Sequence, residues 1–133
     1  MDTERAALID RFYEALTQRD VSAVLALCHD DVEVYKAPGV VEMVSALTPR
    51  GREGVAHWLE GWLASWDLYE PSVERLSDAG DKVVALLHVH SRGRGSQFDL
   101  EEEMADVLTL RDEKISGMRL YVSRDEALRE LGD

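Results

Sequence analysis

The sequence predicts an α+β fold in which a mostly antiparallel sheet is covered on one face by about three helices. Through most of the first 66 residues, apolar side chains recur at the spacing of an α-helix. From Asp67 onward they alternate instead at the period of a β-strand. Turn-forming residues such as those of Ser77–Gly80 divide this second part into segments of strand length. Helices followed by an antiparallel meander are typical of α+β proteins.

The first part of the chain contains two predicted helices, a strand and a segment with two interpretations. A helix over residues 4–18 buries a face made of Leu8, Ile9, Phe12, Tyr13 and Leu16. Asp20 caps a short second helix with an apolar side of Val21, Val24, Leu25 and Cys28. Residues 32–36 alternate as a short strand that Ala37–Gly39 ends. The apolar segment Val40–Arg50 is either a lid or a short helix.

The remaining elements are a long helix, four strands and a last short helix. Residues 52–66 form a helix whose stripe consists of Val55, Trp58, Leu59, Trp62, Leu63 and Trp66. Three tryptophans on one stripe predict a core face or a pocket wall. Strands are predicted at Leu68–Leu76, Lys82–Arg92, Phe98–Leu110 and Ile115–Val122. Ser123 or Asp125 then caps a helix over Glu126–Leu131.

Length and charge limit the classes of partner. The 133 residues are predicted to form one domain, 1–133, with a formal net charge of −12. Nucleic acids and anionic membranes need a basic face, so neither is expected as a partner. The single cysteine, Cys28, cannot form an internal disulfide, which favours a cytoplasmic protein. The charged N-terminus does not have the pattern of a signal peptide.

The most informative segment is the predicted strand Phe98–Leu110. One face carries Phe98, Leu100, Glu102, Met104, Asp106, Leu108 and Leu110, because alternate side chains of a strand point to opposite faces. A carboxylate on an apolar face must be paired, protonated or placed in a wet cavity. Asp106, between Met104 and Leu108, is therefore the first candidate for a functional site. The alternative is an Asp bonded to a neighbouring backbone group or cation, or a face that is solvated.

The strand Lys82–Arg92 carries two histidines on one face. Its even-numbered face holds Val84, Leu86, His88 and His90, and its odd-numbered face holds Val83, Ala85, Leu87 and Val89. A histidine beside a carboxylate makes a serviceable acid–base pair near neutral pH. If the odd-numbered face is the inner one, both histidines are surface residues. If it is the outer one, its apolar character predicts a dimer across it.

Four segments, in order, carry a family resemblance: LIDRFYEALTQRD, DDVEVY, GREGVAHWL and LRDEKISGMRLYVSRDEAL. They resemble the SnoaL-like (polyketide cyclase-like) branch of the nuclear transport factor 2-like superfamily, which is related to the ketosteroid isomerases. The resemblance implies a cone-shaped α+β barrel with a cavity between a curved sheet and the helices. It also implies a homodimer formed on the outer face of the sheet.

The resemblance also assigns individual residues. Asp106 falls where ketosteroid isomerases place the protonated aspartate of their oxyanion hole, an acid kept neutral by its apolar surroundings. The isomerases' catalytic tyrosine aligns with Phe12, with Tyr13 adjacent, and their catalytic base aligns with Lys36. These two departures argue against a steroid isomerase. The alignment turns the even-numbered face of Lys82–Arg92 toward the cavity.

The resulting hypothesis is an enzyme of cofactor-free acid–base chemistry on an apolar cyclic or polyketide-like molecule, of the isomerase, cyclase or dehydratase type. Asp106 is the predicted acid or oxyanion donor, and His88 is a second proton-transfer group. The predicted ligand-binding residues are Phe12, Tyr13, Lys36, Trp58, Trp62, Leu86, His90, Glu102, Met104, Met118 and Leu120. No metal and no cofactor are expected. The alternative is a non-catalytic ligand-binding or dimerisation module, which the missing isomerase tyrosine and base favour.

Two of these residues keep a second interpretation. An inward Lys36 can pair with Asp106 or Glu102, or bind an anionic group of a substrate. A lysine at a strand end more often extends to solvent, which favours a surface position for Lys36. Glu102 is expected near the mouth of the cavity, where a solvated carboxylate needs no further role.

Overall fold

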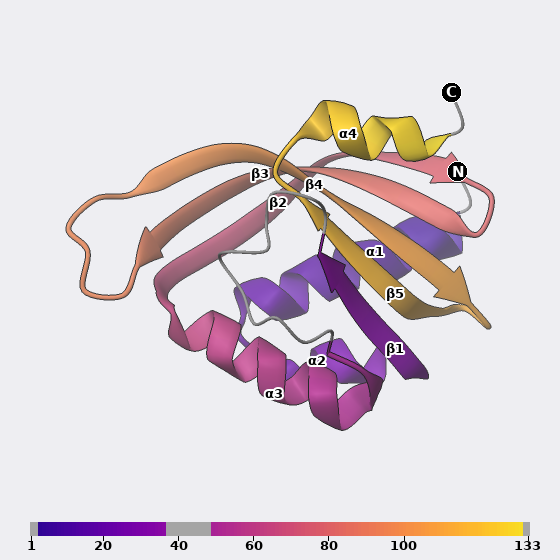
Figure 1. Cartoon of the computed structure of the whole chain (residues 1–133), viewed down its shortest axis with the longest axis horizontal. Coiled ribbons are helices and arrows are strands. Elements are labelled where there is room, and N and C mark those ends of the chain that lie inside the picture. The colour runs from indigo at the N-terminus through magenta and orange to yellow at the C-terminus, as the bar shows by residue number, and fades with distance from the viewer. Residues whose placement is uncertain (1–2, 37–48, 132–133) are drawn as a thin grey trace.

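The computed structural model describes residues 3–36 and 49–131, which form five strands and four α-helices (Figure 1). Their order along the chain is α1 (Thr3–Thr17), α2 (Val21–Ala26), β1 (Cys28–Lys36), α3 (Gly51–Ala64), β2 (Trp66–Ala79), β3 (Lys82–Gly93), β4 (Leu100–Arg111), β5 (Lys114–Tyr121) and α4 (Arg124–Leu128). A single 3₁₀ turn, Arg129–Leu131, follows α4.

The sheet has the strand order β1-β5-β4-β3-β2. Strands β2 to β5 form the predicted antiparallel meander, whereas β1 pairs in parallel with β5. The α+β class and the mostly antiparallel sheet are therefore confirmed. The sheet is curved but open, since β1 and β2 are its two edges in the described part of the chain, so it is not a closed barrel.

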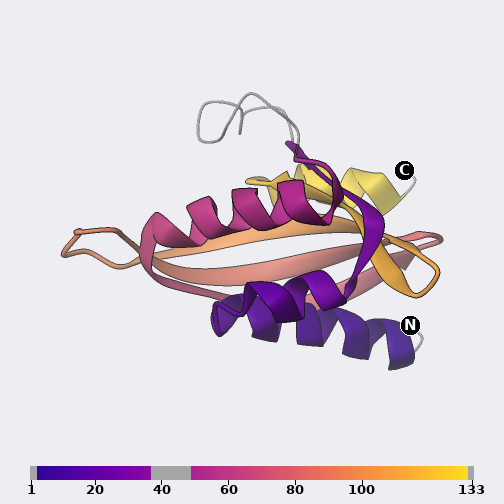
Figure 2. The ribbon, with the colours of Figure 1, turned by 90° about the horizontal axis from the view of Figure 1, so that it is seen from below.

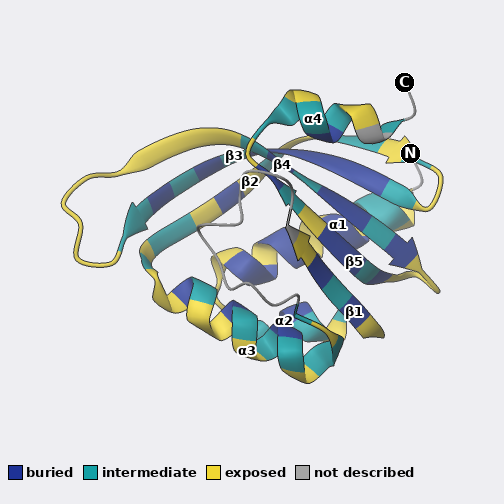
Figure 3. Ribbon diagram, viewed as in Figure 1, coloured by how far each residue is buried: buried dark blue, intermediate teal, exposed yellow. Residues whose placement is uncertain are grey.

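Three helices lie on one face of this sheet. Figure 2 shows α1 and α2 along one side and α3 along the other, with the strands behind them. The main core forms between these helices and the inner sheet face, and it includes Ile9, Val55, Leu87, Leu108 and Ile115. The predicted helical stripes supply the helical part of this core, because their apolar residues face the sheet. The buried segments appear dark blue in Figure 3.

The second helix ends, and the first strand begins, earlier in the chain than the sequence pattern predicts. Helix α2 ends at Ala26, and β1 begins at Cys28 instead of at residue 32. The backbone of Ile115 donates to Leu27 at 2.9 Å, which ties the end of α2 to β5. Cys28 is therefore the first residue of the edge strand β1, and it is fully buried. Similarly, Trp66 is the first residue of β2 and not the last of α3.

The odd-numbered face of β3 is the inner one, contrary to the alignment. Val83, Ala85, Leu87 and Val89 all belong to the main core under the helices. Their apolar character is therefore accounted for by helix packing within one chain. The separate argument for a dimer across this face no longer applies, and the homodimer stays a prediction of the family resemblance alone.

Helix α4 lies on the opposite face of the sheet, above the strands in Figure 1. Ser123 caps it by accepting a hydrogen bond from the Glu126 backbone at 3.3 Å, as one of the two predicted caps. Beneath α4 lies a second buried cluster of Val84, Leu86, Ala105, Val107, Tyr121 and Ala127. The expectation that only one face is covered is wrong, because these apolar outer positions require a cover of their own.

Two sequence-based expectations concern other parts of the chain. Most of the Val40–Arg50 segment, interpreted as a lid or a short helix, lies outside the described residues. Within the described ranges, no helix combines the length and the apolar character needed to cross a membrane.

Candidate functional site

A narrow cavity of about 40 Å³ lies between the helices and the inner face of the sheet. Its apolar lining comes from α1, α2, α3 and β5 and consists of Phe12, Leu16, Val24, Val55, Trp58, Leu59, Trp62, Met118 and Leu120. Two oxygen-bearing side chains, Tyr69 of β2 and Asp106 of β4, complete this lining. A space of this size accommodates about three water molecules. An apolar cavity with a few polar groups is the usual form of a small-molecule site.

The register of the sheet places Asp106 in this cavity. Asp106 pairs with Ala85 of β3 and with Leu120 of β5. The Tyr13 hydroxyl of α1 donates a hydrogen bond of 2.6 Å to Oδ2 of Asp106. Oδ1 has no such partner among the described residues, and Asp106 is partly accessible from the cavity.

Burial controls the protonation of the carboxyl group. Removal from water raises the pKa of Asp106 from 3.8 to about 6, and the hydrogen bond from Tyr13 opposes this rise because it favours the charged form. At neutral pH the group is therefore mainly a carboxylate. Burial and the neighbouring Asp106 raise the pKa of Tyr13 well above its usual value, so Tyr13 stays a protonated donor.

A cluster of aromatic rings forms the cavity wall that comes from α3 and β2. The indoles of Trp58 and Trp62 stack with centroids 6.0 Å apart and an interplanar angle of 16°. The Tyr69 ring meets Trp62 edge to face at 5.9 Å. Burial is the main cause that raises the pKa of Tyr69, and the charge of Asp106 adds to it. Tyr69 therefore remains protonated as well.

The structure places several predicted residues at this cavity. Asp106 lines it together with Phe12, Trp58, Trp62, Met118 and Leu120. Tyr13 does not line the cavity. Its hydroxyl group on α1 donates a hydrogen bond to the Asp106 carboxyl group. The alignment paired the isomerase tyrosine with Phe12. In this chain Phe12 forms part of the apolar wall, and the adjacent Tyr13 makes the contact with the carboxyl group.

The two histidines lie on the other face of the sheet. Because Ala85 and Asp106 are directly paired on the inner face, residues 86, 88 and 90 point outward. His88 Nε2 lies 3.3 Å from Oε1 of Glu101, and His90 Nε2 lies 2.8 Å from Oδ2 of Asp99. The predicted neighbourhood of His88 and Asp106 is therefore corrected, since the sheet separates them. Leu86 packs in the outer cluster beneath α4.

The other predicted ligand-binding residues do not contribute a described side chain to the cavity. Glu102 is exposed and pairs with Val89 near the free end of β4. Met104 packs against the main core without lining the cavity. Lys36 pairs with Leu120 through its backbone, and its side chain lies outside the described part of the structure.

Tyr69 was missed by the sequence analysis. It shares the inner face of β2 with Pro71 and Val73, since these three residues pair with Ser91, Val89 and Leu87. The period-two alternation of Tyr69, Pro71 and Val73 is the signal that could have found it. The proline obscured that signal, because proline is uncommon within strands.

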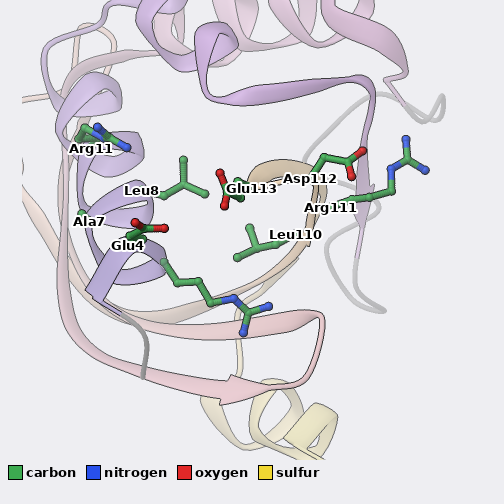
Figure 4. A pocket seen from close by; sticks show the side chains of 9 residues that line it. Glu4, Ala7, Leu8, Arg11, Leu110, Arg111, Asp112 and Glu113 are labelled. Carbon is green, nitrogen blue, oxygen red and sulfur yellow. The ribbon is translucent and has the colours of Figure 1, made fainter.

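A second, larger hollow of about 620 Å³ lies between the start of α1 and the β4–β5 turn (Figure 4). Its lining is mostly charged and consists of Glu4, Arg5, Ala7, Leu8, Arg11, Leu110, Arg111, Asp112 and Glu113. Arg5 is already paired with Asp78, and Arg111 donates to Asp31 at 2.8 Å. Charges of both signs with existing partners indicate a solvated surface hollow and not a shaped site.

Over residues 3–36 and 49–131, no group of three or more histidine, cysteine, aspartate or glutamate side chains is arranged to hold a metal ion. The polar chemistry of the cavity thus rests on Asp106, Tyr13 and Tyr69 among the described residues.

Comparison with solved structures identifies the fold. An NTF2-like protein of unknown function from Burkholderia pseudomallei has a TM-score of 0.80 at 15% identity, covering 99% of this chain and 100% of that one. A Mycobacterium tuberculosis protein in complex with estradiol-17β-hemisuccinate has a TM-score of 0.74 at 20% identity, covering 93% and 97%. A putative polyketide cyclase from Sinorhizobium meliloti has a TM-score of 0.68 at 16% identity, covering 86% and 93%.

Sequence comparison agrees with this fold assignment. A search of curated proteins gives no significant match. A family model described as the SnoaL-like domain matches residues 9–118, which is most of the chain. The resemblance predicted from the sequence motifs is confirmed, and the chain belongs to the SnoaL-like domain family.

Proposed function

We propose that this protein is a cofactor-free acid–base enzyme for a small, largely apolar molecule, of the isomerase, cyclase or dehydratase type. The observation that carries the proposal is the Asp106 carboxyl group, which lines an apolar cavity and accepts a hydrogen bond from Tyr13. A perturbed carboxyl group in a cavity is a common mark of a catalytic site. Asp106 takes a proton from a substrate carbon and returns it to another position.

The role of Tyr13 is to orient the base. Its hydrogen bond engages Oδ2 of Asp106 and leaves Oδ1 for the substrate. A pKa of about 6 for Asp106 suits a general base near neutral pH, because proton transfer is most efficient when the catalytic pKa is close to the working pH. This role differs from that of the neutral oxyanion-hole acid implied by the resemblance.

The similar structures support a small organic ligand. The Mycobacterium tuberculosis protein was crystallised with estradiol-17β-hemisuccinate, and the Sinorhizobium meliloti protein is described as a putative polyketide cyclase. These ligands and activities belong to those proteins. They support the proposal that this chain binds a small molecule as well.

One observation favours the alternative of a non-catalytic binding module. Asp106 is the only side chain of the described lining that titrates near neutral pH, and His88 lies across the sheet from it. A reaction that needs both a general acid and a separate general base would therefore lack one of these two groups in the described cavity. Proton shuttling by one carboxylate does not need such a partner, which is why the enzyme remains the leading proposal.

Exchange of substrate hydrogen for deuterium tests the proposal. Cyclopentanone and cyclohexanone in D₂O report proton abstraction directly, because each turnover replaces hydrogen next to the carbonyl group by deuterium. The enzyme should accelerate this exchange over buffer for at least one of the two ketones, as followed by proton NMR. Saturable binding of both ketones without any acceleration would support the binding module instead.

The pH dependence of the exchange should follow the protonation of Asp106. Since the carboxylate is the active form of a general base, kcat/KM should rise with pH and reach half of its plateau near the pKa of about 6. Rates measured between about pH 4.5 and 8 define this profile. A profile that falls over the same range would contradict the assignment of Asp106 as the base.

Association of two copies is the remaining proposal. The family resemblance implies a homodimer, and sedimentation velocity at micromolar concentration measures it directly. The outer sheet face that would take part carries α4 over its apolar cluster, so a dimer has to include α4 or use the polar strand ends beside it.

A further inference from the structure

His90 lies on the outer face of the sheet with a carboxylate group at each of its two ring nitrogens. Nδ1 lies 3.4 Å from Oε1 of Glu70, which belongs to β2 and is directly paired with His90 in the sheet. Nε2 lies 2.8 Å from Oδ2 of Asp99, the last residue before β4. One imidazole ring on β3 therefore bridges the edge strand β2 and the connection that leads into β4.

Only one protonation state of the His90 ring satisfies this geometry. A neutral imidazole has one N–H group and one lone pair, whereas an imidazolium has two N–H groups. In the neutral ring, one of the two nitrogens would direct its lone pair at a carboxylate oxygen. The imidazolium faces both carboxylates favourably, so the bridge between Glu70 and Asp99 requires a protonated His90.

The charges closest to His90 favour its protonated form. The hydrogen bond to Asp99 is the main cause that raises the pKa of His90 above its ordinary value of 6.5. The negative charges of Glu70 and Glu101 add to this rise, and partial removal from water opposes it. Arg92, the next outward residue of β3, shares the Asp99 carboxylate, with its Nε 3.5 Å from Oδ1. Three carboxylates thus outnumber one guanidinium around the ring.

The remaining charged groups on this part of the outer face have partners other than His90. Nε2 of His88 lies 3.3 Å from Oε1 of Glu101 on the paired strand β4. Arg124, at the start of α4, contacts the carboxylates of Glu74 on β2 and Glu103 on β4. None of these contacts includes His90, so its protonation can change without breaking them.

The connection 94–99 is anchored in different ways at its two ends. At its beginning, the Gly95 backbone donates a hydrogen bond of 3.0 Å to Oδ2 of Asp67. At its end, the side chain of Asp99 ties it to β3 through charged contacts. The whole connection is exposed, and Figures 1 and 2 show it projecting beyond the helices. Its second half is therefore held by one carboxylate, and the contact of this carboxylate with His90 depends on pH.

We propose that His90 is a pH-sensitive clamp on the end of the β3–β4 connection. Its charged form joins Asp99 to Glu70 and holds the end of the connection against the sheet. When the proton leaves to solvent, the ring keeps one N–H group and no charge, so one carboxylate contact is lost and the other is weakened. The end of the connection then gains motion. This inference does not rest on the proposed function, because the clamp lies across the sheet from the cavity.

The direction of the pH effect follows from the raised pKa of His90. A group whose pKa is raised by its folded surroundings stabilises the folded arrangement below its ordinary pKa, here 6.5. This stabilisation is lost as pH rises through the raised value. The clamp is therefore closed in mildly acidic solution and open in alkaline solution.

NMR titration of the imidazole ring tests the charged contacts. The pKa of His90 should lie above 6.5 in the wild type, and Asp99→Asn should lower it toward 6.5 because the main cause of the rise is removed. Asp10→Asn makes the same change in net charge on the exposed face of α1 and should leave this pKa unchanged. A wild-type pKa at or below 6.5, or an unchanged pKa in Asp99→Asn, would overturn the inference.

Backbone ¹⁵N relaxation tests the motion. In the wild type, the order parameters of Phe98 and Asp99 should fall from roughly 0.85 at about pH 5.5 to roughly 0.7 at about pH 8.5. His90→Gln should give the lower values at both pH values, because glutamine carries no charge at either. His57→Gln removes an exposed histidine of α3 instead and should behave like the wild type.

Two results of the relaxation experiment would contradict the clamp. One is a wild type whose order parameters in the connection are the same at both pH values. The other is a fall of equal size in His90→Gln, which would assign the motion to a different titrating group. Asp106, with a pKa of about 6, is such a group, and it is retained in His90→Gln.

Discussion

Asp106→Asn should lose deuterium exchange activity by roughly 10²- to 10⁴-fold, the range for a removed general base. The amide group is nearly the same size as the carboxyl group, and its oxygen can still accept the hydrogen bond that Tyr13 donates at 2.6 Å. The cavity therefore keeps its shape while losing its only base in the described lining. The rates are measured by NMR at about pH 7.5, above the pKa of about 6.

The control for this variant is Asp10→Asn, which makes the same chemical change on the exposed face of α1. It should retain the wild-type rate. A loss of activity in Asp10→Asn would attribute the effect to net charge, and full activity in Asp106→Asn would remove the catalytic assignment.

The same substitution should also change how stability depends on pH. The folded-state pKa of Asp106 lies near 6, above the unfolded value near 3.8, so the native protein holds a proton that the unfolded chain releases between these values. The free energy of unfolding of the wild type therefore falls as pH rises through this window. One pKa unit corresponds to about 1.4 kcal/mol, so the full effect of Asp106 is about 3 kcal/mol.

Asp106→Asn removes this contribution, since asparagine does not titrate. Relative to the wild type, the variant should gain about 2.4 kcal/mol of stability between about pH 4 and pH 7.5, because the unfolded carboxyl is already partly ionised at pH 4. Urea unfolding followed by tryptophan fluorescence at the two pH values measures the difference. Subtraction of the two proteins cancels the titration of other groups, such as His90, whose pKa is raised mainly by its hydrogen bond to Asp99. A constant difference at both pH values would mean that Asp106 titrates like an exposed carboxyl group.

The order of elements could be predicted from periodicity because each helix or strand buries one face. The stripe of α3 and the alternation of β4 both follow this rule. The inward position of Asp106 was predictable for the same reason, since Met104 and Leu108 on either side of it belong to the core. Each of these elements has one apolar face in its sequence pattern, so only that face can pack against the core.

The orientation of β3 could not be predicted in this way. Both of its faces are apolar near the middle, because the odd-numbered residues meet the helices and Val84 and Leu86 meet α4. The alignment then chose the even-numbered face and placed His88 in the cavity. A strand that is buried on both faces has no alternation to read. The position of α4 on the outer face was the missing information.

The role of the tyrosines also depends on three-dimensional contacts. Phe12 and Tyr13 are adjacent on α1 and both are buried, so helix periodicity does not separate their roles. Tyr69 reaches the cavity from β2, two residues before Pro71. Their contacts with Asp106 and Trp62 depend on how α1, α3 and β2 pack together.

The pairing of β3 with β4 runs from Lys82–Thr109 to Ser91–Leu100 without a bulge. A slip by one residue would either bring the histidines of β3 inward or turn Asp106 of β4 out to solvent, so the register of this ladder has to be kept. Changes in chain length between these strands must then be absorbed by the exposed connection 94–99, which projects beyond the helices in Figures 1 and 2. This connection is the natural place to insert an epitope or a fluorophore peptide without disturbing the cavity.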